Sequence, residues 1–294
     1  MGMGQALAQA SPAARATFEE ADDVLKFDLS ALCWEGPEEI LTDTVNAQPA
    51  LYVCGLAVLR AFEERVGEFQ PVCAAGHSLG ELTALTAAGA MEFEDGLLLV
   101  RERGRLMKAA GEESPGGMAA ILGLDAPALA DVCAEATRQA EGVVQIANDN
   151  CPGQVVVSGD KAALEKAVEL ARAKGARRAV RLAVSIAAHS PLMQRAADRF
   201  RDAVDAVPFI APAFPVVGNV RAQPLSDANA IRAELPAQLT SPVRWHESVQ
   251  TMLALGATAF LEFGPKDVLT GLLKRIEKGA MGIAVGEPNA LLAL

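Results

Sequence analysis

The feature that most constrains this 294-residue chain is a Gly-x-Ser-x-Gly pentapeptide at residues 76–80. A short apolar run, residues 72–75, precedes it, and helix-forming residues 81–88 follow it. A strand that turns abruptly into a helix crowds the backbone around its serine, so we expect both glycines to be required. Such a turn exposes the Ser78 hydroxyl at a helix N-terminus, where free N–H groups can stabilise an oxyanion. The pattern favours an α/β fold with a nucleophilic serine, and a glycine-rich turn with an incidental serine is the alternative.

The composition supports the α/β class and excludes several functions. Hydrophobic residues make up 51% of the chain and aromatic residues only 4%, which favours helices packed closely on a sheet. The formal net charge of -11 argues against nucleic-acid binding, because phosphate binding requires a positive face. The sequence has no apolar run of about 18 residues and no signal peptide, so we expect a cytoplasmic protein without membrane contact. Its 5 scattered cysteines lack the spacing of a metal site, so we expect reduced thiols and no metal.

Basic residues gather in two segments of this acidic chain. The first segment contains Lys174, Arg177, Arg178 and Arg181, and the second contains Lys266, Lys274, Arg275 and Lys278. Solvated helix faces would explain either cluster as well as an anion-binding surface does. An acidic partner, however, would have to dock on a local positive surface of this kind.

A change in the hydrophobic pattern near residue 114 predicts a second folding unit. From there we expect strand 118–122, helix 127–140, strands 143–147 and 154–158, helix 161–174 and strand 178–184. This βαββαβ order is typical of a ferredoxin-like unit. We therefore expect residues 114–184 to form an inserted small subdomain, and residues 1–113 plus 185–294 to form the larger domain. In the larger domain we expect helices 11–24, 48–64, 81–88, 93–110, 191–204, 247–255 and 266–278, and strands 216–219 and 259–263.

A serine nucleophile needs a base, and the chain has three histidines, His77, His189 and His246. Neighbouring side chains diverge at a strand-to-helix turn, which makes His77 a poor base for Ser78. His246 lies beside a predicted helix start, where a packing or capping role is the simpler interpretation. His189 lies between a predicted strand and a predicted helix, where reactive groups gather in α/β folds. We therefore expect His189 to be the base.

Seven motifs together resemble the malonyl-CoA:acyl carrier protein transacylase family of fatty acid synthesis. They are Gln48-Pro49-Ala50, Gly76-His77-Ser78-Leu79-Gly80-Glu81, Arg101-Glu102-Arg103-Gly104, Gly117-Met118-Ala119-Ala120-Ile121, Ala147-Asn148-Asp149-Asn150-Cys151-Pro152-Gly153-Gln154, Ala188-His189-Ser190-Pro191-Leu192-Met193 and Glu262-Phe263-Gly264-Pro265. Their order and spacing over nearly the whole chain make the resemblance specific. It implies an α/β-hydrolase-like large domain, an inserted ferredoxin-like small subdomain and an active site between them.

The resemblance also implies roles for individual residues in a ping-pong transfer through a malonyl-Ser78 ester. His189 would take the serine proton, Gln238 would orient His189, and the backbone N–H of Leu79 would stabilise the oxyanion. Arg103 would bind the malonyl carboxylate through two parallel hydrogen bonds. Taken alone, the sequence permits a solvated cation at this position. Further substrate-binding positions implied by the resemblance are His77, Asn148 and Asn150.

The partners implied are malonyl-CoA and acyl carrier protein, with no cofactor, and we expect a monomer. One alternative is an acyltransferase of polyketide synthesis that uses malonyl or a branched malonyl group. Others are an N-terminally incomplete, catalytically impaired carrier-binding homologue and a plain serine esterase. The start, Met1-Gly2-Met3-Gly4, looks like the end of the family's first loop, Gly-Gln-Gly-Ser-Gln followed by Gly-Met-Gly. We expect the preceding strand and loop to be encoded upstream.

Overall fold

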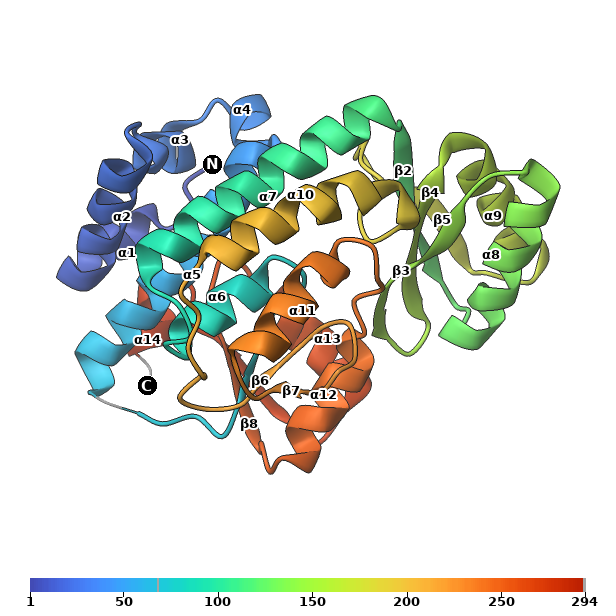
Figure 1. The fold of residues 1–294 in the computed structure, drawn as a ribbon. Helices are drawn as coiled ribbons and strands as arrows, with labels where there is room; N and C mark the ends of the chain where they lie inside the picture. Colours follow the sequence, from blue (N-terminus) through green and yellow to red (C-terminus); the bar gives the residue numbers. More distant parts are fainter. Residues whose placement is uncertain (68, 293–294) are drawn as a thin grey trace.

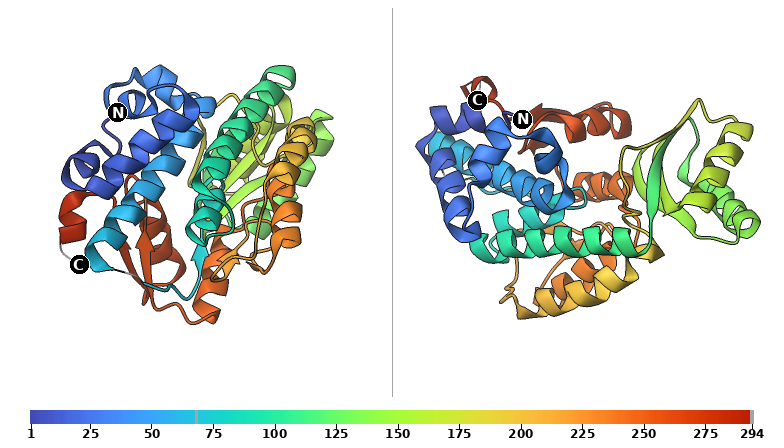
Figure 2. Two further views of the ribbon diagram at one scale, coloured as in Figure 1. Left: turned by 60° about the vertical axis from the view of Figure 1, so that its left-hand side comes forward. Right: turned by 90° about the horizontal axis from the view of Figure 1, so that it is seen from above.

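The computed structural model describes residues 1–67 and 69–292, which divide into a main body and a smaller unit at one end of it (Figure 1 and Figure 2). We call the segment from Gly116 to Arg181 the small unit and the remainder the main body. In the main body, helices surround short strands, and in the small unit two helices cover one face of a sheet. The structure confirms the predicted α/β class.

Two long helices, α5 (Thr44–Val66) and α7 (Phe93–Glu113), pack against each other in the main body. Their backbones approach closely at Gly104, where an added Cβ would lie 2.6 Å from the carbonyl oxygen of Thr44. Helix α5 is long and apolar enough to cross a membrane, but 67% of its most apolar window is buried inside the protein. Its apolar surface is therefore that of a core helix, although no uninterrupted apolar run marks it in the sequence.

The strands of the main body are short. β1 (Ala74–Ala75) pairs in parallel with β6 (Val216–Val217), and β6 pairs antiparallel with β7 (Pro224–Leu225). A separate parallel pair is formed by β8 (Ala259–Glu262) and β9 (Met281–Ala284). Both β1 and β6 are thus shorter than the predicted strands 72–75 and 216–219. β1 pairs on one side only, and its pairing with β6 ends where the chain turns into the pentapeptide.

The small unit has the element order that the sequence predicts. β2 (Gly116–Leu122), β3 (Val144–Cys151), β4 (Gln154–Asp160) and β5 (Arg178–Arg181) form a sheet in the order β3-β4-β2-β5, with all neighbours antiparallel. Asp125 and Asp160 cap the covering helices α8 (Ala126–Ala140) and α9 (Lys161–Ala173) by accepting backbone N–H bonds. Burial alternates along β2, as expected for a strand with one face against helices. β5 ends at Arg181, three residues earlier than predicted.

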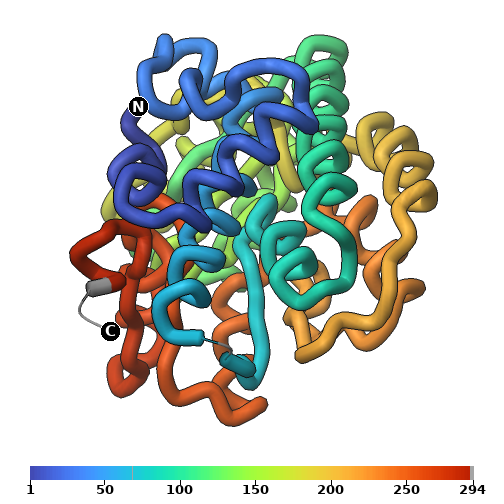
Figure 3. Tube along the Cα trace, turned by 90° about the vertical axis from the view of Figure 1, so that its left-hand side faces the viewer, coloured from blue at the N-terminus to red at the C-terminus, as the bar shows by residue number. Residues whose placement is uncertain are grey.

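The remaining helices complete the main body. Those predicted from the sequence are α2 (Pro12–Leu25), α6 (Gly80–Ala87), η1 (Pro191–Met193) with α10 (Gln194–Ala206), α12 (Trp245–Ala254) and α13 (Val268–Ile276). Those not predicted are α1 (Gln5–Ala10), α3 (Leu29–Glu35), α4 (Glu38–Thr42), α11 (Ala228–Gln238) and α14 (Pro288–Leu292). α1 and α14 touch, so the first and last helices lie on the same side of the main body (Figure 3).

Candidate active site

Ser78 lies at a sharp turn between β1 and α6. Its backbone φ is 53°, a left-handed conformation that costs a non-glycine residue roughly 1–2 kcal/mol. Gly76 is required here, because an added Cβ would lie 1.8 Å from the carbonyl oxygen of Gly80. The same expectation is wrong for Gly80, whose added Cβ would meet nothing within 4 Å. Gly80 is the first residue of α6 and faces open space, so only one of the two glycines is demanded by packing.

His189 and Ser78 form the predicted nucleophile–base pair. Ser78 Oγ lies 2.8 Å from His189 Nε2, and His189 Nδ1 lies 2.8 Å from the backbone oxygen of Gln238. A carbonyl oxygen can only accept, so Nδ1 carries the proton and Nε2 of the neutral ring accepts the serine hydroxyl. Burial, reinforced by the Arg103 charge, lowers the pKa of His189 to about 3. The imidazole is therefore neutral and available as a base at physiological pH.

The backbone of His189 is held by a residue that the sequence did not single out. His189 has a φ of 57°, and its carbonyl oxygen accepts a hydrogen bond of 2.8 Å from Gln145 Nε2. The same amide nitrogen lies 3.0 Å from the carbonyl oxygen of Thr240. Gln145 is on β3, so the small unit contributes directly to the position of the base in the main body.

Arg103 is buried beside the nucleophile, with only 2% of its surface exposed. Its neighbours along α7 differ, because Arg105 is exposed and pairs with Glu102. The Arg103 guanidinium donates to three oxygens, Oε1 of Gln48, Oε1 of Gln238 and Oγ of Ser78. The interpretation of Arg103 as a solvated surface cation is therefore wrong.

The charge of Arg103 has no carboxylate partner within ion-pair distance in the described part of the chain. Burial lowers the pKa of Arg103 to about 10, opposed by the charge of Glu81, so the group stays cationic near neutral pH. Three of its five N–H donors are used, and Nε has no partner among the described residues. A buried cation with unused donors is a site for a small carboxylate.

Gln238 lies at the end of α11 and contacts all three central groups. Its backbone oxygen orients His189, its Oε1 accepts from Arg103 at 2.7 Å, and its Nε2 donates to the Ser78 carbonyl at 3.1 Å. The side chain therefore positions the arginine and the serine, while the main chain orients the histidine. Gln48 belongs to one of the seven motifs, but no role was predicted for it. Its Oε1 accepts a hydrogen bond of 2.7 Å from the other terminal nitrogen of Arg103.

The remaining predicted positions lie around this centre. The Leu79 N–H has no hydrogen-bond partner within residues 1–67 and 69–292 and precedes the first turn of α6. His77 Nε2 contacts Asn150 Oδ1 at 2.8 Å, and its ring lies 5.6 Å from that of Trp245, so it does not contact Ser78 Oγ. Asn148 is buried on β3 and pairs through its backbone with Val243, without a side-chain hydrogen bond to the other site residues described.

His246 takes no part in the site. It lies half-buried in the first turn of α12, with its ring nitrogen 3.2 Å from the amide of the exposed Gln250, and no described side chain caps this helix, so the capping interpretation is wrong. No role was predicted from the sequence for Asn219, or for Glu81, which belongs to one of the seven motifs. Both residues are fully buried next to the pentapeptide. A polar residue at the end of the predicted strand 216–219, two residues after β6, was the signal for Asn219.

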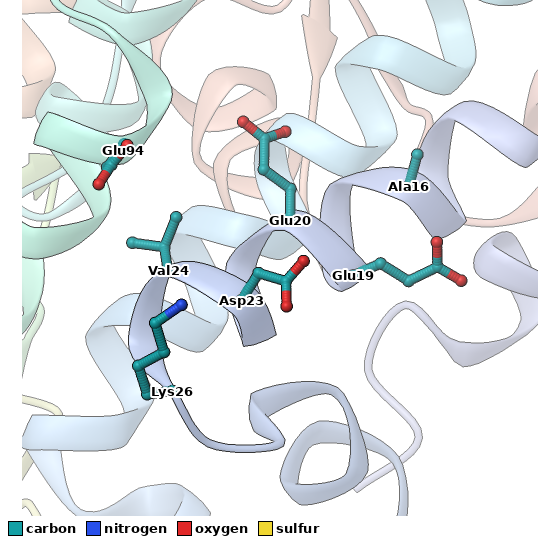
Figure 4. A pocket seen from close by; sticks show the side chains of 7 residues that line it. All are labelled: Ala16, Glu19, Glu20, Asp23, Val24, Lys26 and Glu94. Carbon is teal, nitrogen blue, oxygen red and sulfur yellow. The ribbon is translucent and has the colours of Figure 1, made fainter.

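A hollow in the described surface lies away from these site residues. It measures about 530 Å³ and lies along α2 and the start of α7 (Figure 4). Its charged lining consists of Glu19, Glu20, Asp23 and Glu94 opposite a single lysine, Lys26. Arg103 lies nine residues after Glu94 on α7, about 14 Å further along the helix axis. The negative lining makes this hollow unsuitable for an anionic substrate.

Metal-ligand geometry does not occur in the described residues, which contain no group of three or more His, Cys, Asp or Glu side chains able to hold an ion. All five cysteines are free, and four of them are buried. Burial raises the pKa of the Cys33, Cys54 and Cys133 thiols to about 12, so they are protonated and poorly nucleophilic.

Comparison with known proteins gives consistent matches over the whole chain. The sequence profile of the family described as acyl transferase domain matches residues 1–286. A protein of Bacillus subtilis (strain 168), the malonyl CoA-acyl carrier protein transacylase, is 45% identical over 99% of this chain and 91% of its own length. Among solved structures, the malonyl CoA-acyl carrier protein transacylase of Coxiella burnetii superimposes with a TM-score of 0.96 at 38% identity, covering 100% of this chain and 92% of that one. A malonyl-transacylase in complex with a type II PKS acyl-carrier protein gives a TM-score of 0.96 at 43% identity, covering 100% of this chain and 94% of that one.

Proposed function

Because the chain belongs to the acyl transferase domain family, we propose that it transfers malonyl groups from malonyl-CoA to the phosphopantetheine thiol of acyl carrier protein for fatty acid biosynthesis. The single observation that carries the choice of acyl group is the buried guanidinium of Arg103, 3.2 Å from the Ser78 hydroxyl and without a carboxylate partner among the described residues. A malonyl carboxylate would supply the missing negative charge. An acetyl group would leave the buried cation unpaired.

The first half-reaction forms an ester on Ser78. His189 Nε2 takes the hydroxyl proton while Ser78 Oγ attacks the thioester carbonyl, and the 2.8 Å contact between them supports this role. The tetrahedral oxyanion would accept a hydrogen bond from the free Leu79 N–H at the start of α6. When the carbon–sulfur bond breaks, the protonated His189 returns its proton to the departing CoA thiolate. The malonyl-enzyme and free CoA are the products.

The second half-reaction reverses these steps with a new thiol. His189 takes the proton of the phosphopantetheine thiol, the thiolate attacks the malonyl ester, and Ser78 recovers its proton. The Gln238 carbonyl keeps the proton of the neutral imidazole on Nδ1 throughout, and this hydrogen bond strengthens when the ring becomes cationic. Neither half-reaction changes the oxidation state of any atom, and we propose no cofactor.

Basic residues distant in sequence offer a docking surface for an acidic carrier protein. Arg275 on α13 donates to the carbonyl oxygen of Pro152, on the loop between β3 and β4, and to the side chain of Gln154, the first residue of β4. The Gly123 N–H donates to the carbonyl oxygen of Gly153 on that loop. The Arg177 side chain lies next to Gly123. We call the exposed residues of this edge the basic rim, namely Lys174, Arg177, Arg178 and Arg275. A local positive surface would attract an acidic protein despite the net charge of -11.

Two architectural proposals accompany this function. Residues 1–113 plus 185–294 form an α/β-hydrolase-like catalytic domain, and residues 114–184 form a ferredoxin-like subdomain. The antiparallel strand order β3-β4-β2-β5 and the separate buried cluster between this sheet and its two helices support the second assignment. We also propose that the protein acts as a monomer, and we place the reaction in the cytoplasm.

Intact-mass spectrometry tests the proposed function in two steps. Incubation with malonyl-CoA should add one malonyl group to the protein, and subsequent addition of holo acyl carrier protein should remove it and yield malonyl-carrier. Acetyl-CoA at equal concentration should acylate the protein far more slowly. Release of the malonyl group to water at the same rate with or without carrier would instead support the esterase alternative.

A further inference from the structure

Ser78 keeps a strained backbone conformation, and its surroundings must hold it there. Its φ of 53° lies in the region that non-glycine residues avoid, at a cost of roughly 1–3 kcal/mol when the residue is locked at a functional site. Such a conformation persists only where neighbouring contacts over-determine it. The hydroxyl contacts of Ser78 with His189 and Arg103 fix the side chain, and the backbone needs separate support.

The side chain of Asn219 supplies that support. Its Oδ1 accepts the backbone N–H of Ser78 at 2.7 Å, and its Nδ2 donates to the carbonyl oxygen of Gly76 at 2.8 Å. One fully buried amide therefore bridges the two peptide groups on either side of His77. It also occupies the Ser78 N–H, whereas the N–H of Leu79 has no partner among the described residues.

Asn219 is in turn held by a buried carboxyl group. Glu81 Oε2 accepts the backbone N–H of Asn219 at 2.7 Å, and Glu81 lies in the first turn of α6, the helix that follows Ser78. The contacts thus close a ring from the pentapeptide to Asn219 and back through Glu81. Glu234 acts in parallel, because its Oε1 accepts the N–H of the next residue, Val220, at 2.6 Å.

The approach of this second carboxyl group depends on a glycine. An added Cβ at Gly218 would lie 2.8 Å from Glu234 Oε1, so a larger residue would push the carboxyl group away. Glu81 is completely buried and Glu234 is 7% exposed. Both carboxyl groups are too deeply buried to interact with a partner at the protein surface. Their hydrogen bonds go instead to the backbone N–H groups of Asn219 and Val220.

We propose that Glu81 is a positioning residue for the nucleophile, acting on Ser78 through Asn219, with Glu234 fixing the adjacent peptide. This inference depends on the proposed function only because it concerns the serine that is acylated in the proposed reaction. Burial and the neighbouring Glu234 raise the pKa of Glu81 to about 8, which favours the neutral form of its carboxyl group. A neutral glutamine should therefore replace it well, because an amide oxygen can also accept the Asn219 N–H.

The test uses the full chain and a probe that does not depend on malonyl recognition. Phenylmethylsulfonyl fluoride sulfonylates a positioned serine, with fluoride leaving and the serine proton passing to the base. Its rate on Ser78 and the single-turnover rate with malonyl-CoA would be measured in Asn219→Ala, Glu81→Ala, the double variant and Glu81→Gln. Displacement of a catalytic group by about 1 Å can cost roughly 10²-fold in rate, so we expect losses of that order in both alanine variants.

The double variant and the glutamine variant decide the outcome. If Glu81 acts through Asn219, the double variant is no slower than the slower single variant, and Glu81→Gln stays within about threefold of the parent. Malonyl-CoA affinity should not change in Asn219→Ala, because the Asn219 side chain bonds to the backbone of Ser78 and Gly76 and not to Arg103. Thr17→Ala, a buried polar change in α2, is the control for lost stability alone and should leave both rates unchanged.

Three results would overturn the proposal: full activity in Asn219→Ala, rate losses that multiply in the double variant, or a glutamine variant as slow as the alanine variant. Asn219→Ala and Glu81→Gln decide the question even if Glu81→Ala does not fold. Sulfonylation of the parent protein without acylation by malonyl-CoA would refute the proposed function and leave this inference open to the same measurements.

Discussion

Replacement of Arg103 by alanine should abolish the preference for malonyl over acetyl groups. In the structure this guanidinium is buried, cationic and 3.2 Å from Ser78 Oγ, with unused donors. Each hydrogen bond to a charged group contributes about 1.5–3 kcal/mol, so two bonds to a malonyl carboxylate contribute about 3–6 kcal/mol. At 1.4 kcal/mol per factor of ten, the malonylation rate constant should fall by about 10²–10⁴-fold. Acetylation should change by less than tenfold, because acetyl has no carboxylate.

The assay is single-turnover acylation followed by intact mass, with malonyl-CoA and acetyl-CoA in direct competition. The variant also leaves the amide oxygens of Gln48 and Gln238 without a donor, so its thermal unfolding must be measured alongside. Arg105→Ala on the same helix is the matched control, since that side chain is exposed and pairs only with Glu102 among the described carboxylates. Equal losses for malonyl and acetyl groups in Arg103→Ala would refute the reasoning, because they would indicate a general structural defect.

Three further predictions follow from other contacts. Because the pKa of His189 is lowered to about 3, the folded state binds fewer protons than the unfolded state, whose histidine pKa is near 6.5. Stability from this group is complete above pH 6.5 and is lost as pH falls toward 3, and His189→Gln should flatten this part of a pH–unfolding curve. Gln145→Ala should lower the single-turnover acylation rate by about tenfold or more at unchanged malonyl-CoA affinity, because it frees the backbone of the base. Charge reversal of Lys174, Arg177 and Arg178 to glutamate should slow transfer to carrier protein and leave acylation by malonyl-CoA intact, with the difference shrinking at high salt.

Each of these has a clear contrary result. An unchanged pH–unfolding curve in His189→Gln would show that the imidazole is not neutralised by its burial. A lower affinity without a lower rate in Gln145→Ala would place that residue in binding. For the basic rim, reversal of Arg195, Arg199 and Arg201 on α10 is the control, and equal slowing of both half-reactions in the rim variant would contradict a docking role.

The central chemistry could be predicted from the sequence because it depends on local features. A strand, a pentapeptide and a helix occur in immediate succession, so Ser78 follows from short-range geometry. The choice of His189 over His246 depended on its place after a predicted strand, and the structure confirms that contact with Ser78. The small unit was equally accessible, since alternating strand and helix patterns give its element order directly.

The rest of the site depends on contacts between distant segments. Gln145, Gln48 and Asn219 are uncharged polar residues in unremarkable sequence surroundings, and only the fold brings them to Ser78, His189 and Arg103. Arg103 resembles Arg101 and Arg105 in sequence, and its nearly complete burial distinguishes it. The expectation for Gly80 failed for a similar reason, because the direction of a Cβ at the start of α6 depends on the turn itself. Helix α11, which carries Gln238, was missed altogether.

The most direct test of the account is to locate the acyl group on the malonyl-enzyme. After brief reaction with malonyl-CoA, acid quenching and peptide mass spectrometry should find one malonyl group on the peptide that contains Ser78. Ser78→Ala should carry none, and His189→Ala should acquire it far more slowly. A malonyl adduct that persists in Ser78→Ala, or that lies on any other residue, would contradict the mechanism.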